Sequence, residues 1–188
     1  MLKEFRSPFI FYCDLSNHKE IKETYYPHIK DIFEESKDTK VETWNCEVLT
    51  TFNFNVQFFY DDLFQNSVIW QPLDRMLEEV NLCQYPLNSW IHGIWANYYD
   101  KGAFQEVHDH VGVNRTHFSG IYIMDQTGEN KTSFINNNFG ILDQQLHTKD
   151  IDDIKEGSVI LFPSNLLHYV NPVDDPRCTI SFNIMCEF

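Results

Sequence analysis

Hydrophobic residues in the first half of the chain recur with helical spacing in two stretches. The first follows Asn17, which forms a capping-box pattern with Glu20, and its apolar positions are Ile21, Tyr25, Ile29, Ile32 and Phe33. Pro27 interrupts this stretch, so we predict either a kinked helix or two short helices. The second predicted helix begins at Pro72, ends near Cys83 and has the buried stripe Leu73, Met76, Leu77 and Val80.

Three other stretches in this half are less regular. Residues 8–13 form a short apolar run, which predicts a first strand. Residues 42–50 alternate between apolar and polar positions, with Trp44, Cys46 and Val48 on one face, which predicts a half-buried strand. Residues 52–66 are rich in Phe and Asn and mix both periods, so their structure stays open.

From Trp90 onward the pattern becomes that of β-strands. The predicted strands are Trp90–Tyr99, Glu106–His110, Ser119–Asp125, Val159–Phe162 and Thr179–Met185. Residues 126–150 are predicted to be a long polar connection, interrupted by the short runs Ser133–Ile135 and Gly140–Leu142. Helices followed by antiparallel strands indicate an α+β fold, mostly β, in which a sandwich or small barrel carries the helices on one outer face.

Length and composition limit the number of domains and the classes of substrate that we expect. We expect a single domain over residues 1–188, with 1–89 supplying supporting elements and 90–188 the barrel. The net charge of -14 and the lack of a basic cluster count against nucleic acid and favour a small-molecule, peptide or protein substrate. Five cysteines without CxxC spacing indicate reduced thiols. No stretch is long enough for a signal peptide or membrane span, so we expect a cytoplasmic protein of undetermined oligomeric state.

Two histidines, His108 and His110, lie two residues apart in a predicted strand and therefore point to the same face. Together they can bind one metal ion, and His168, which follows a buried strand, is the natural third ligand. Such a set leaves open positions on the metal, as in non-haem iron sites. Alternatively, the first two histidines lie on the surface and His168 is a core residue. His117 is a rival ligand, and Asp109 becomes one if the strand bulges.

The sequence around these histidines resembles a known family. Gly157 precedes a buried strand, His168 follows it, Asn171-Pro172-Val173 comes next, and Arg177-Cys178-Thr179 begins nine positions after the histidine. Upstream, Gln105 stands three residues before His108, and Phe118-Ser119-Gly120-Ile121-Tyr122 fits the next strand. This arrangement resembles the iron(II)/2-oxoglutarate-dependent dioxygenases, most of all their prolyl-4-hydroxylase-like branch in bacteria and phages. The resemblance covers residues 90–188.

The resemblance implies a double-stranded β-helix, the jelly-roll or cupin-like barrel, with N-terminal helices packed on one outer face. It implies an enzyme that uses Fe(II), held by His108, His110 and His168, with 2-oxoglutarate as co-substrate and dioxygen as oxidant. Arg177 and Thr179 are then expected to bind the distal carboxylate of 2-oxoglutarate, because a guanidinium can hold a carboxylate through two hydrogen bonds. Further candidates for contact with the co-substrate are Asn97, Tyr99 and Tyr122.

The chain departs from the family at one ligand. The usual motif is His-x-Asp, whereas here His110 takes the place of the aspartate. The expected reaction is hydroxylation of a C–H bond coupled to conversion of 2-oxoglutarate to succinate, with peptidyl proline as the first substrate by analogy. We expect the substrate to enter beneath the loop Val111–Phe118 and the segment 126–150. The alternatives are a three-histidine dioxygenase of cupin type that uses no 2-oxoglutarate, and a non-catalytic barrel that binds a ligand. In both alternatives Arg177 has no co-substrate to bind. A simpler interpretation of Arg177 is an ion pair with Asp174 or Asp175 at the end of the strand.

Overall fold

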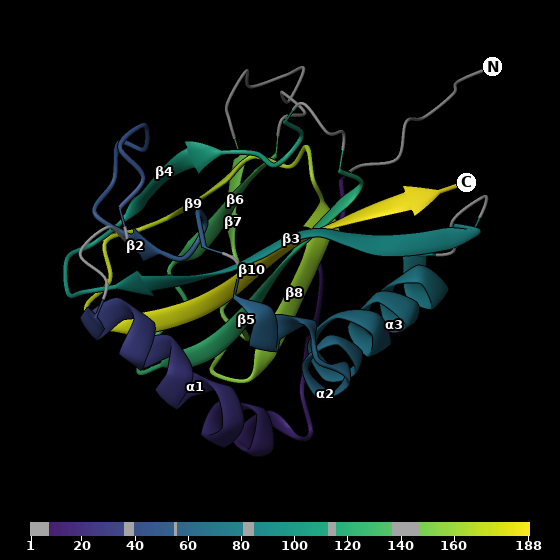
Figure 1. Ribbon diagram of the computed structural model, residues 1–188. Coiled ribbons are helices and arrows are strands. Elements are labelled where there is room, and N and C mark those ends of the chain that lie inside the picture. The colour runs from purple at the N-terminus through teal and green to yellow at the C-terminus, as the bar shows by residue number, and fades with distance from the viewer. Residues whose placement is uncertain (1–7, 36–39, 55, 81–84, 113–115, 137–146) are drawn as a thin grey trace.

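The computed structural model describes residues 8–35, 40–54, 56–80, 85–112, 116–136 and 147–188. The strands in these ranges are β1 (Phe11–Asp14), β2 (Leu49–Thr50), β3 (Asn88–Tyr99), β4 (Gln105–His108), β5 (Phe118–Gln126), β6 (Thr132–Asn136), β7 (His147–Asp150), β8 (Ser158–Pro163), β9 (His168–Val170) and β10 (Arg177–Glu187) (Figure 1). The helical elements are α1 (His18–Glu35), η1 (Gln57–Tyr60), α2 (Asp62–Phe64), η2 (Gln65–Trp70) and α3 (Gln71–Val80).

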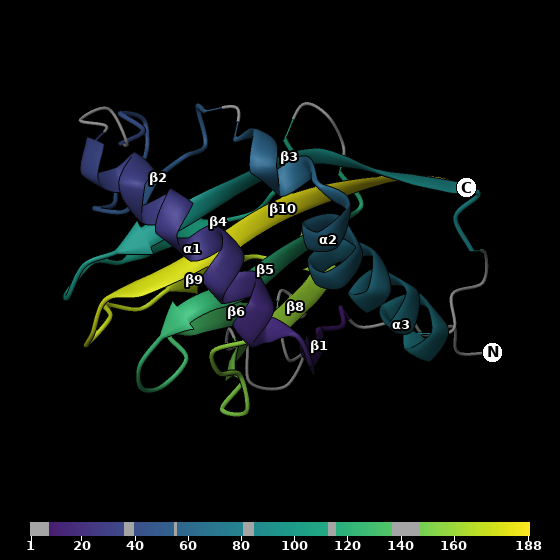
Figure 2. The same ribbon diagram turned by 60° about the horizontal axis from the view of Figure 1, so that its bottom comes forward.

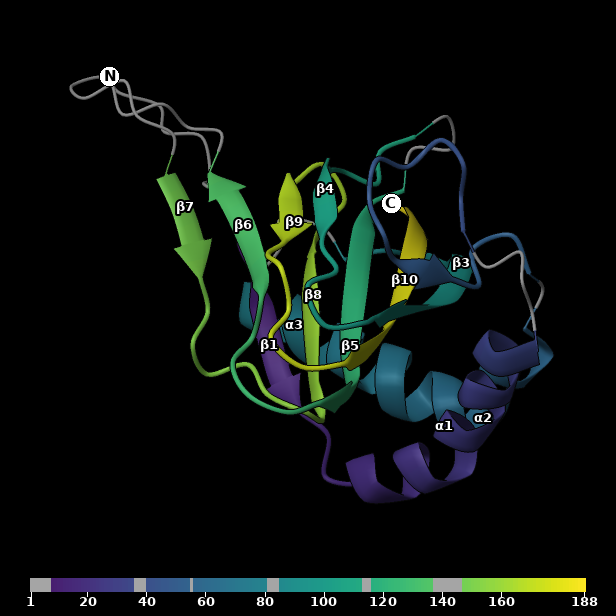
Figure 3. The same ribbon diagram turned by 90° about the vertical axis from the view of Figure 1, so that its left-hand side faces the viewer.

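The strands form two antiparallel sheets that face each other. The larger sheet has the order β1-β8-β5-β10-β3-β2, and the smaller has the order β4-β9-β6-β7. The helices cover the outer face of the larger sheet, and the smaller sheet lies against its inner face (Figures 1 and 3). This arrangement confirms the predicted α+β class, mostly β, with helices on one outer face.

Two apolar layers hold these parts together. The outer layer lies between the helices and the larger sheet, where Ile21, Tyr25 and Ile29 of α1 and Met76 of α3 are fully or almost fully buried. Figure 2 shows α1 crossing the face of this sheet diagonally. The inner layer lies between the two sheets and contains Ile121, Ile123, Phe134, Ile160 and Phe162.

The helix α1 runs through Pro27 as one element, so the alternative of two short helices is wrong. Proline removes one backbone hydrogen bond from a helix. Pro27 is exposed, and the carbonyl that loses its partner can therefore be solvated by water. The buried side chains on the opposite face, Ile21, Tyr25 and Ile29, hold the helix against the sheet on both sides of the proline.

Residues 42–50 are not the predicted strand, because only Leu49–Thr50 pairs with β3. The preceding residues form turns, and Trp44 and Cys46 pack against a small cluster that includes Val48 and Tyr99. The alternation in the sequence therefore reflects local packing at the sheet edge rather than a ladder of backbone hydrogen bonds.

The second helical run begins ten residues before Pro72, at Asp62 of α2, and passes through the π-helical segment η2 into α3. The carboxylate of Asp61 caps its start by accepting a hydrogen bond from the amide of Phe64 at 2.8 Å. The predicted helix corresponds to α3, which begins one residue before Pro72 but continues a longer helical run. The open stretch 52–66 contains η1, α2 and the beginning of η2. The predicted end near Cys83 lies outside the described residues.

The predicted polar connection 126–150 contains two strands, since β6 pairs with β7 in antiparallel register. The run Ser133–Ile135 lies inside β6, and Gly140–Leu142 falls outside the described residues. Within the part of the chain that the structure covers, no helix is long and apolar enough to cross a membrane.

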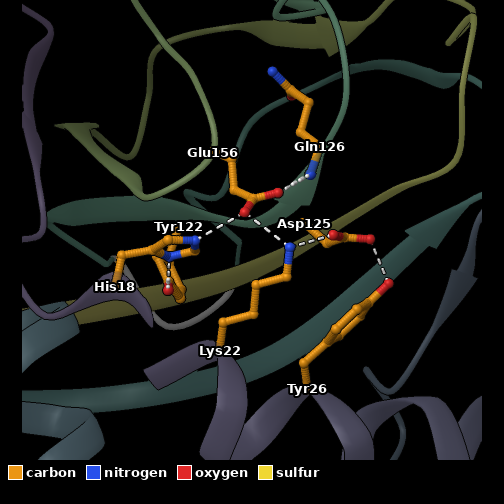
Figure 4. Close-up of polar contacts among 7 residues, drawn as sticks. All are labelled: His18, Lys22, Tyr26, Tyr122, Asp125, Gln126 and Glu156. Atoms are coloured by element: carbon orange, nitrogen blue, oxygen red, sulfur yellow. Dashed lines mark hydrogen bonds and ion pairs between the residues drawn. The ribbon is translucent and has the colours of Figure 1, made fainter. Parts of the chain in front are cut away.

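A network of charged and polar side chains fastens α1 to the larger sheet (Figure 4). The ammonium group of Lys22 lies 2.5 Å from a carboxylate oxygen of Asp125 and 2.8 Å from one of Glu156. The backbone amide of Gln126 also donates to Glu156, at 3.0 Å. Burial by itself raises the pKa of Glu156, but the hydrogen bonds from Lys22, the Gln126 amide and His18 outweigh it and lower the pKa to about 2.

We predict that Glu156→Gln lowers the free energy of unfolding at pH 7 by about 1–2 kcal/mol, because it removes charge-assisted hydrogen bonds. The folded-state pKa of Glu156 lies below that of an unfolded glutamate, about 4.3. The stabilisation is therefore fully present above the unfolded value and is lost as the pH falls toward about 2. Urea unfolding of both proteins between pH 7 and pH 3 measures this difference. Glu78→Gln, an exposed change on α3, is the control, and a difference independent of pH would contradict the assignment.

Candidate metal centre

Three histidines meet between the two sheets. His108 ends β4 and His168 begins β9, and these two residues lie directly opposite each other in the antiparallel register of the smaller sheet. His110 follows β4 by two residues. Their ring centroids are 4.3 Å apart for His108 and His168, 5.0 Å for His110 and His168, and 5.3 Å for His108 and His110. One ligand nitrogen from each histidine lies within 4.8 Å of those of the other two.

The second predicted strand, Glu106–His110, ends earlier than expected, at His108. The register of β4 and β9 shifts between Gln105 and His108, and the chain bends after the strand. A hydrogen bond of 2.9 Å from the amide of His110 to the carbonyl of Ser164 holds the residue in place. His110 therefore reaches the other two histidines through a bend and an anchored backbone, and not through strand alternation alone.

Each of the three imidazole rings is oriented by an acceptor at Nδ1. The acceptor is the carbonyl of Glu106 for His108 at 2.7 Å and the carbonyl of Leu166 for His168 at 3.0 Å. For His110 it is the side-chain oxygen of Asn183, at 2.7 Å. Carbonyl oxygens only accept hydrogen bonds, so Nδ1 carries the proton and Nε2 of each ring is available as a metal ligand.

The surroundings keep these histidines neutral. Burial, followed by the neighbouring histidines, lowers the pKa of His168 well below its usual value. Burial and the nearby His108 lower that of His110 to about 4. Burial also lowers the pKa of His108. Because a metal ion binds the neutral imidazole, the set is ready for a metal at neutral pH. Three imidazole nitrogens fit a divalent transition metal such as Fe(II).

The two rival ligands lie elsewhere. Asp109 is exposed, and its carboxylate accepts a hydrogen bond of 3.1 Å from the amide of Val111. His117 accepts a hydrogen bond from the amide of Cys186 at 3.1 Å and packs against the ring of Phe188. Among the described residues, the group that could hold a metal consists of His108, His110 and His168.

A narrow cavity lies behind the three histidines. Its volume is about 10 Å³, and it is bordered by Asn97, Tyr99, Arg177 and Thr179, together with Trp95, Gln105, Ile121, Thr132, Val170 and Ser181. The register of β3 and β10 explains part of this set, because Arg177 lies opposite Tyr99 and Thr179 opposite Asn97. Four of the five residues predicted to bind the co-substrate therefore lie around one cavity next to the histidines.

Arg177 is a buried cation without a counter-ion in the described part of the chain. It is only 2% exposed, and its Nη2 donates to the hydroxyl of Thr132 at 2.8 Å. Its Nε and Nη1 have no hydrogen-bond partner there. Asp174, one of the predicted alternative partners, instead pairs with Lys131 at 2.8 Å. Burial lowers the pKa of Arg177 to about 10, so the group is still charged at neutral pH.

An uncompensated buried charge is costly, and it therefore indicates a site that binds an anion. A carboxylate is an anion that can accept hydrogen bonds from the free N–H groups of this guanidinium. Two further polar groups border the same cavity. Tyr99 donates to Gln105 at 2.7 Å, and the side-chain oxygen of Asn97 is a buried acceptor without a partner among the described residues. The guanidinium of Arg177 therefore fits one carboxylate of a dicarboxylate such as 2-oxoglutarate.

Tyr122 does not belong to this site, which corrects the expectation that it contacts the co-substrate. Its side chain points to the outer face of β5, where its hydroxyl lies 2.7 Å from Nδ1 of His18 (Figure 4). Its neighbours in the strand, Ile121 and Ile123, face the inner layer instead. Both faces of β5 are buried, so hydrophobicity alone does not show which face a residue of this strand takes.

Four residues at the site were not predicted from the sequence. Ser181 and Asn183 continue the series of every second residue that starts at Arg177 and Thr179 on β10, and this spacing was a usable signal. Thr132 and Trp95 carried no such signal. The first lies in a stretch predicted to be a polar connection, and the second resembles any core aromatic residue.

A groove of about 850 Å³ opens on the other side of the histidines. Its described lining comes from three parts of the chain: Trp44 with residues 52–54 and Tyr60, residues 92–95 of β3, and residues 105–112 with Thr116 and Asn183. None of residues 126–136 and 147–150 takes part in the described lining. The rest of the segment lies outside the described residues, so the predicted entry route on that side stays a prediction. The loop after His110 does take part, through Val111 and Gly112.

Comparison with known proteins agrees with this geometry. Residues 93–183 match a family described as "Putative 2OG-Fe(II) oxygenase", and this span contains His108, His110, His168 and Arg177. No curated protein matches the chain in sequence.

Several solved structures share the fold. A prolyl-4-hydroxylase of Pseudomonas putida is 13% identical with a TM-score of 0.63, and the match covers 94% of this chain and 91% of that one. The viral collagen prolyl hydroxylase of Paramecium Bursaria Chlorella virus-1 is 14% identical with a TM-score of 0.54, covering 96% and 97%. The 2-oxoglutarate-dependent epimerase SnoN from nogalamycin biosynthesis is 9% identical with a TM-score of 0.63, covering 93% and 77%.

At these identities the likeness shows the fold alone, and it confirms the double-stranded β-helix with N-terminal helices. The family match covers the segment that holds the histidines and the buried arginine. The segment 93–183, just under half of the chain, is similar to the 2OG-Fe(II) oxygenase family, which is a family of oxidoreductases.

Proposed function

We propose that this protein is a non-haem dioxygenase that couples conversion of 2-oxoglutarate to succinate with hydroxylation of a C–H bond in a substrate bound in the groove. The observation that carries this proposal is the buried Arg177, whose Nε and Nη1 have no partner in the described structure. The cavity that Arg177 borders also contains all three histidines. A metal and an anion can therefore be held side by side.

The residues have separate roles in this proposal. His108, His110 and His168 hold Fe(II), and Arg177 and Thr179 hold the distal carboxylate of 2-oxoglutarate. When bound, iron supplies the oxidising chemistry, with 2-oxoglutarate and dioxygen as its co-reactants. The protein orients the reactants and excludes water. Phe162 and Phe134 help to do so, because their rings lie 4.8 Å and 5.8 Å from that of His168.

The reaction on the primary substrate is proposed by analogy. Two proteins of the same fold are a prolyl-4-hydroxylase and a collagen prolyl hydroxylase, which makes peptidyl proline the first substrate to assay. Two others are an epimerase and a carbocyclase of nogalamycin biosynthesis, so the fold alone does not select the reaction. The open groove admits either a peptide segment or a small molecule.

A second candidate is a three-histidine dioxygenase that needs no 2-oxoglutarate. It is favoured by His110, which provides a neutral donor where the family has a carboxylate. This candidate gives no role to the buried charge of Arg177, whereas the proposed function requires it. Arg177 therefore distinguishes the two.

We predict that Arg177→Met lowers the affinity for 2-oxoglutarate by about 30-fold or more, because a buried charge pair is lost. Without 2-oxoglutarate, the same change leaves the free energy of unfolding unchanged or raises it by about 1–4 kcal/mol, since a buried charge without a counter-ion is removed. Calorimetric titration of 2-oxoglutarate into the Mn(II)-loaded protein and urea unfolding measure the two effects. Arg177→Lys keeps the charge and loses the forked geometry, so we expect intermediate affinity. Unchanged affinity in Arg177→Met would favour the second candidate.

We predict that the anaerobic Fe(II) protein with 2-oxoglutarate releases succinate once oxygen is admitted, and that His168→Ala and Arg177→Met do not. His117→Ala is the matched control, since this histidine lies outside the set and should leave succinate formation unchanged. His110→Asp restores the usual ligand type of the family and should keep metal binding, whereas His110→Ala should weaken it. Succinate formation that survives in His168→Ala would overturn the assignment of the metal ligands.

Asn183 holds His110 in the orientation that metal binding requires. Its side-chain oxygen accepts from Nδ1 of His110 and from the hydroxyl of Ser119, at 2.7 Å and 2.8 Å. It stands where the register between β10 and β3 shifts, because β3 has one extra residue, His92, at this point. The other two histidines are held by backbone carbonyls, so this is the one orienting contact of the three that a side-chain substitution removes.

We predict that Asn183→Ala lowers the affinity for Zn(II) or Co(II) by about 10- to 100-fold, because the acceptor that fixes the His110 ring is lost. Asn183→Asp keeps an acceptor and should retain the affinity. Competition titration against a coloured chelator measures both. Asn88→Ala is the control, because Asn88 lies at the start of β3, away from the histidines. Equal affinities for the wild type and Asn183→Ala would show that the contact does not orient the ligand.

A further inference from the structure

The groove has an aromatic wall that leads to a metal ligand. The ring of Trp44 lies 5.4 Å from that of Phe52, Phe52 lies 5.2 Å from Trp95, and Trp95 lies 5.6 Å from His110. Phe52 and Tyr60, both in the lining, are 49% and 44% exposed. Large aromatic side chains that stay exposed around a groove indicate a surface that a ligand covers.

The charged residues in the described lining of this groove are both acids, Glu106 and Asp109. Asp109 already caps the amide of Val111. Glu106 lies beside the aromatic wall, because one of its carboxylate oxygens accepts from the amide of Asn45, next to Trp44, at 3.0 Å. Its other carboxylate oxygen is buried and has no hydrogen-bond partner in the described structure. The thiol of Cys46 lies beside the same carboxylate and interacts with it.

A second buried polar group at the groove also lacks a partner. Trp95 is 7% exposed, and its indole nitrogen has no acceptor among the described residues. Trp95 borders both the groove and the narrow cavity behind the histidines. It therefore offers one N–H group to an oxygen of whatever is bound at the junction of the two spaces. A ligand that reaches this junction lies next to the metal ligands.

The combination of aromatic faces and a carboxylate suits a positive charge. A cation gains energy over the faces of Trp and Phe, and a nearby carboxylate adds a charge-assisted hydrogen bond or ion pair. The protein as a whole carries a formal charge of -14, which attracts cations and repels anions at long range. The narrow cavity has the opposite preference, because Arg177 makes it a site for an anion.

We propose that the primary substrate binds in the groove through a cationic group, an ammonium or guanidinium, held between the carboxylate of Glu106 and the aromatic wall of Trp44, Phe52 and Trp95. The proposal rests on the proposed function, in that the substrate so held is the one oxidised beside the histidines. The cation is carried either by a small amine or by a basic side chain of a peptide. Both sources share the same recognition chemistry.

The first test compares three phenols that differ in charge. The cation is 2-(4-hydroxyphenyl)ethyltrimethylammonium, which cannot ligate a metal through its nitrogen. Its uncharged carbon isostere is 4-(3,3-dimethylbutyl)phenol, and the anion is 3-(4-hydroxyphenyl)propanoate. Binding to the Mn(II)-loaded protein with 2-oxoglutarate is measured without oxygen by calorimetry. We expect the cation to bind about 10-fold more tightly than its isostere, and the anion to bind least.

The variants locate the effect. Glu106→Gln keeps an acceptor for the amide of Asn45, so the fold is preserved, and it should bring the cation to within about twofold of its isostere. Trp44→Leu should weaken the cation more than the isostere. Asp152→Asn, an exposed change outside the groove, should leave the preference intact. A wild-type protein without a preference for the cation, or a preference that survives in Glu106→Gln, overturns the proposal.

The second test separates the two sources of the cation. A short peptide with proline followed by lysine is compared with the same peptide carrying norleucine in place of lysine. If the lysine peptide binds more tightly than both the norleucine peptide and the small cation of the first test, the substrate is a peptide. If the small cation binds more tightly than both peptides, the substrate is a small amine. Binding needs no turnover, so a cation preference without succinate refutes the proposed function alone. Succinate formation without a cation preference refutes the present inference alone.

Discussion

Strand β10 pairs along most of its length with both β3 and β5, and this pairing determines where the polar residues of the site lie. Because alternate residues of a strand face the same side, Arg177, Thr179, Ser181 and Asn183 all face the smaller sheet. The register with β3 adds Tyr99 and Asn97 to the same face. One central strand therefore carries Arg177 of the anion site at its beginning and, farther along, Asn183, which orients His110.

The three histidines proposed to bind the metal lie at the smaller sheet, and the direct pairing of His108 with His168 brings two of them together. His110 joins them only because its backbone is anchored to Ser164 and its ring to Asn183. Three neutral imidazoles leave the full charge of a bound divalent metal uncompensated by the ligands. Together with the buried Arg177, this makes the cavity strongly favourable for a dianion such as 2-oxoglutarate. The histidine in place of the usual aspartate is thus compatible with tight binding of the co-substrate.

The two spaces on either side of the histidines differ in charge. The narrow cavity contains the one buried arginine of the described site, whereas the described lining of the groove has carboxylates and aromatic rings. Trp95 borders both. An anionic co-substrate and a cationic substrate can therefore be sorted to opposite sides of one metal by electrostatics alone. Sorting of this kind keeps each reactant out of the other's site.

The candidate residues of the site could be predicted from the sequence, because strand alternation relates neighbours in the chain to a common face. This holds for the spacing of His108 and His110, for His168 after a buried strand, and for Arg177 with Thr179 two residues on. The two helical regions and most strands of the larger sheet could also be predicted, whereas β7 and β9 of the smaller sheet could not. The sequence could not show that Tyr122 points outward, because both faces of β5 are buried. Nor could it show that Thr132 and Trp95 reach the site. These points depend on how the two sheets face each other, and on which residues, far apart in the chain, meet between them.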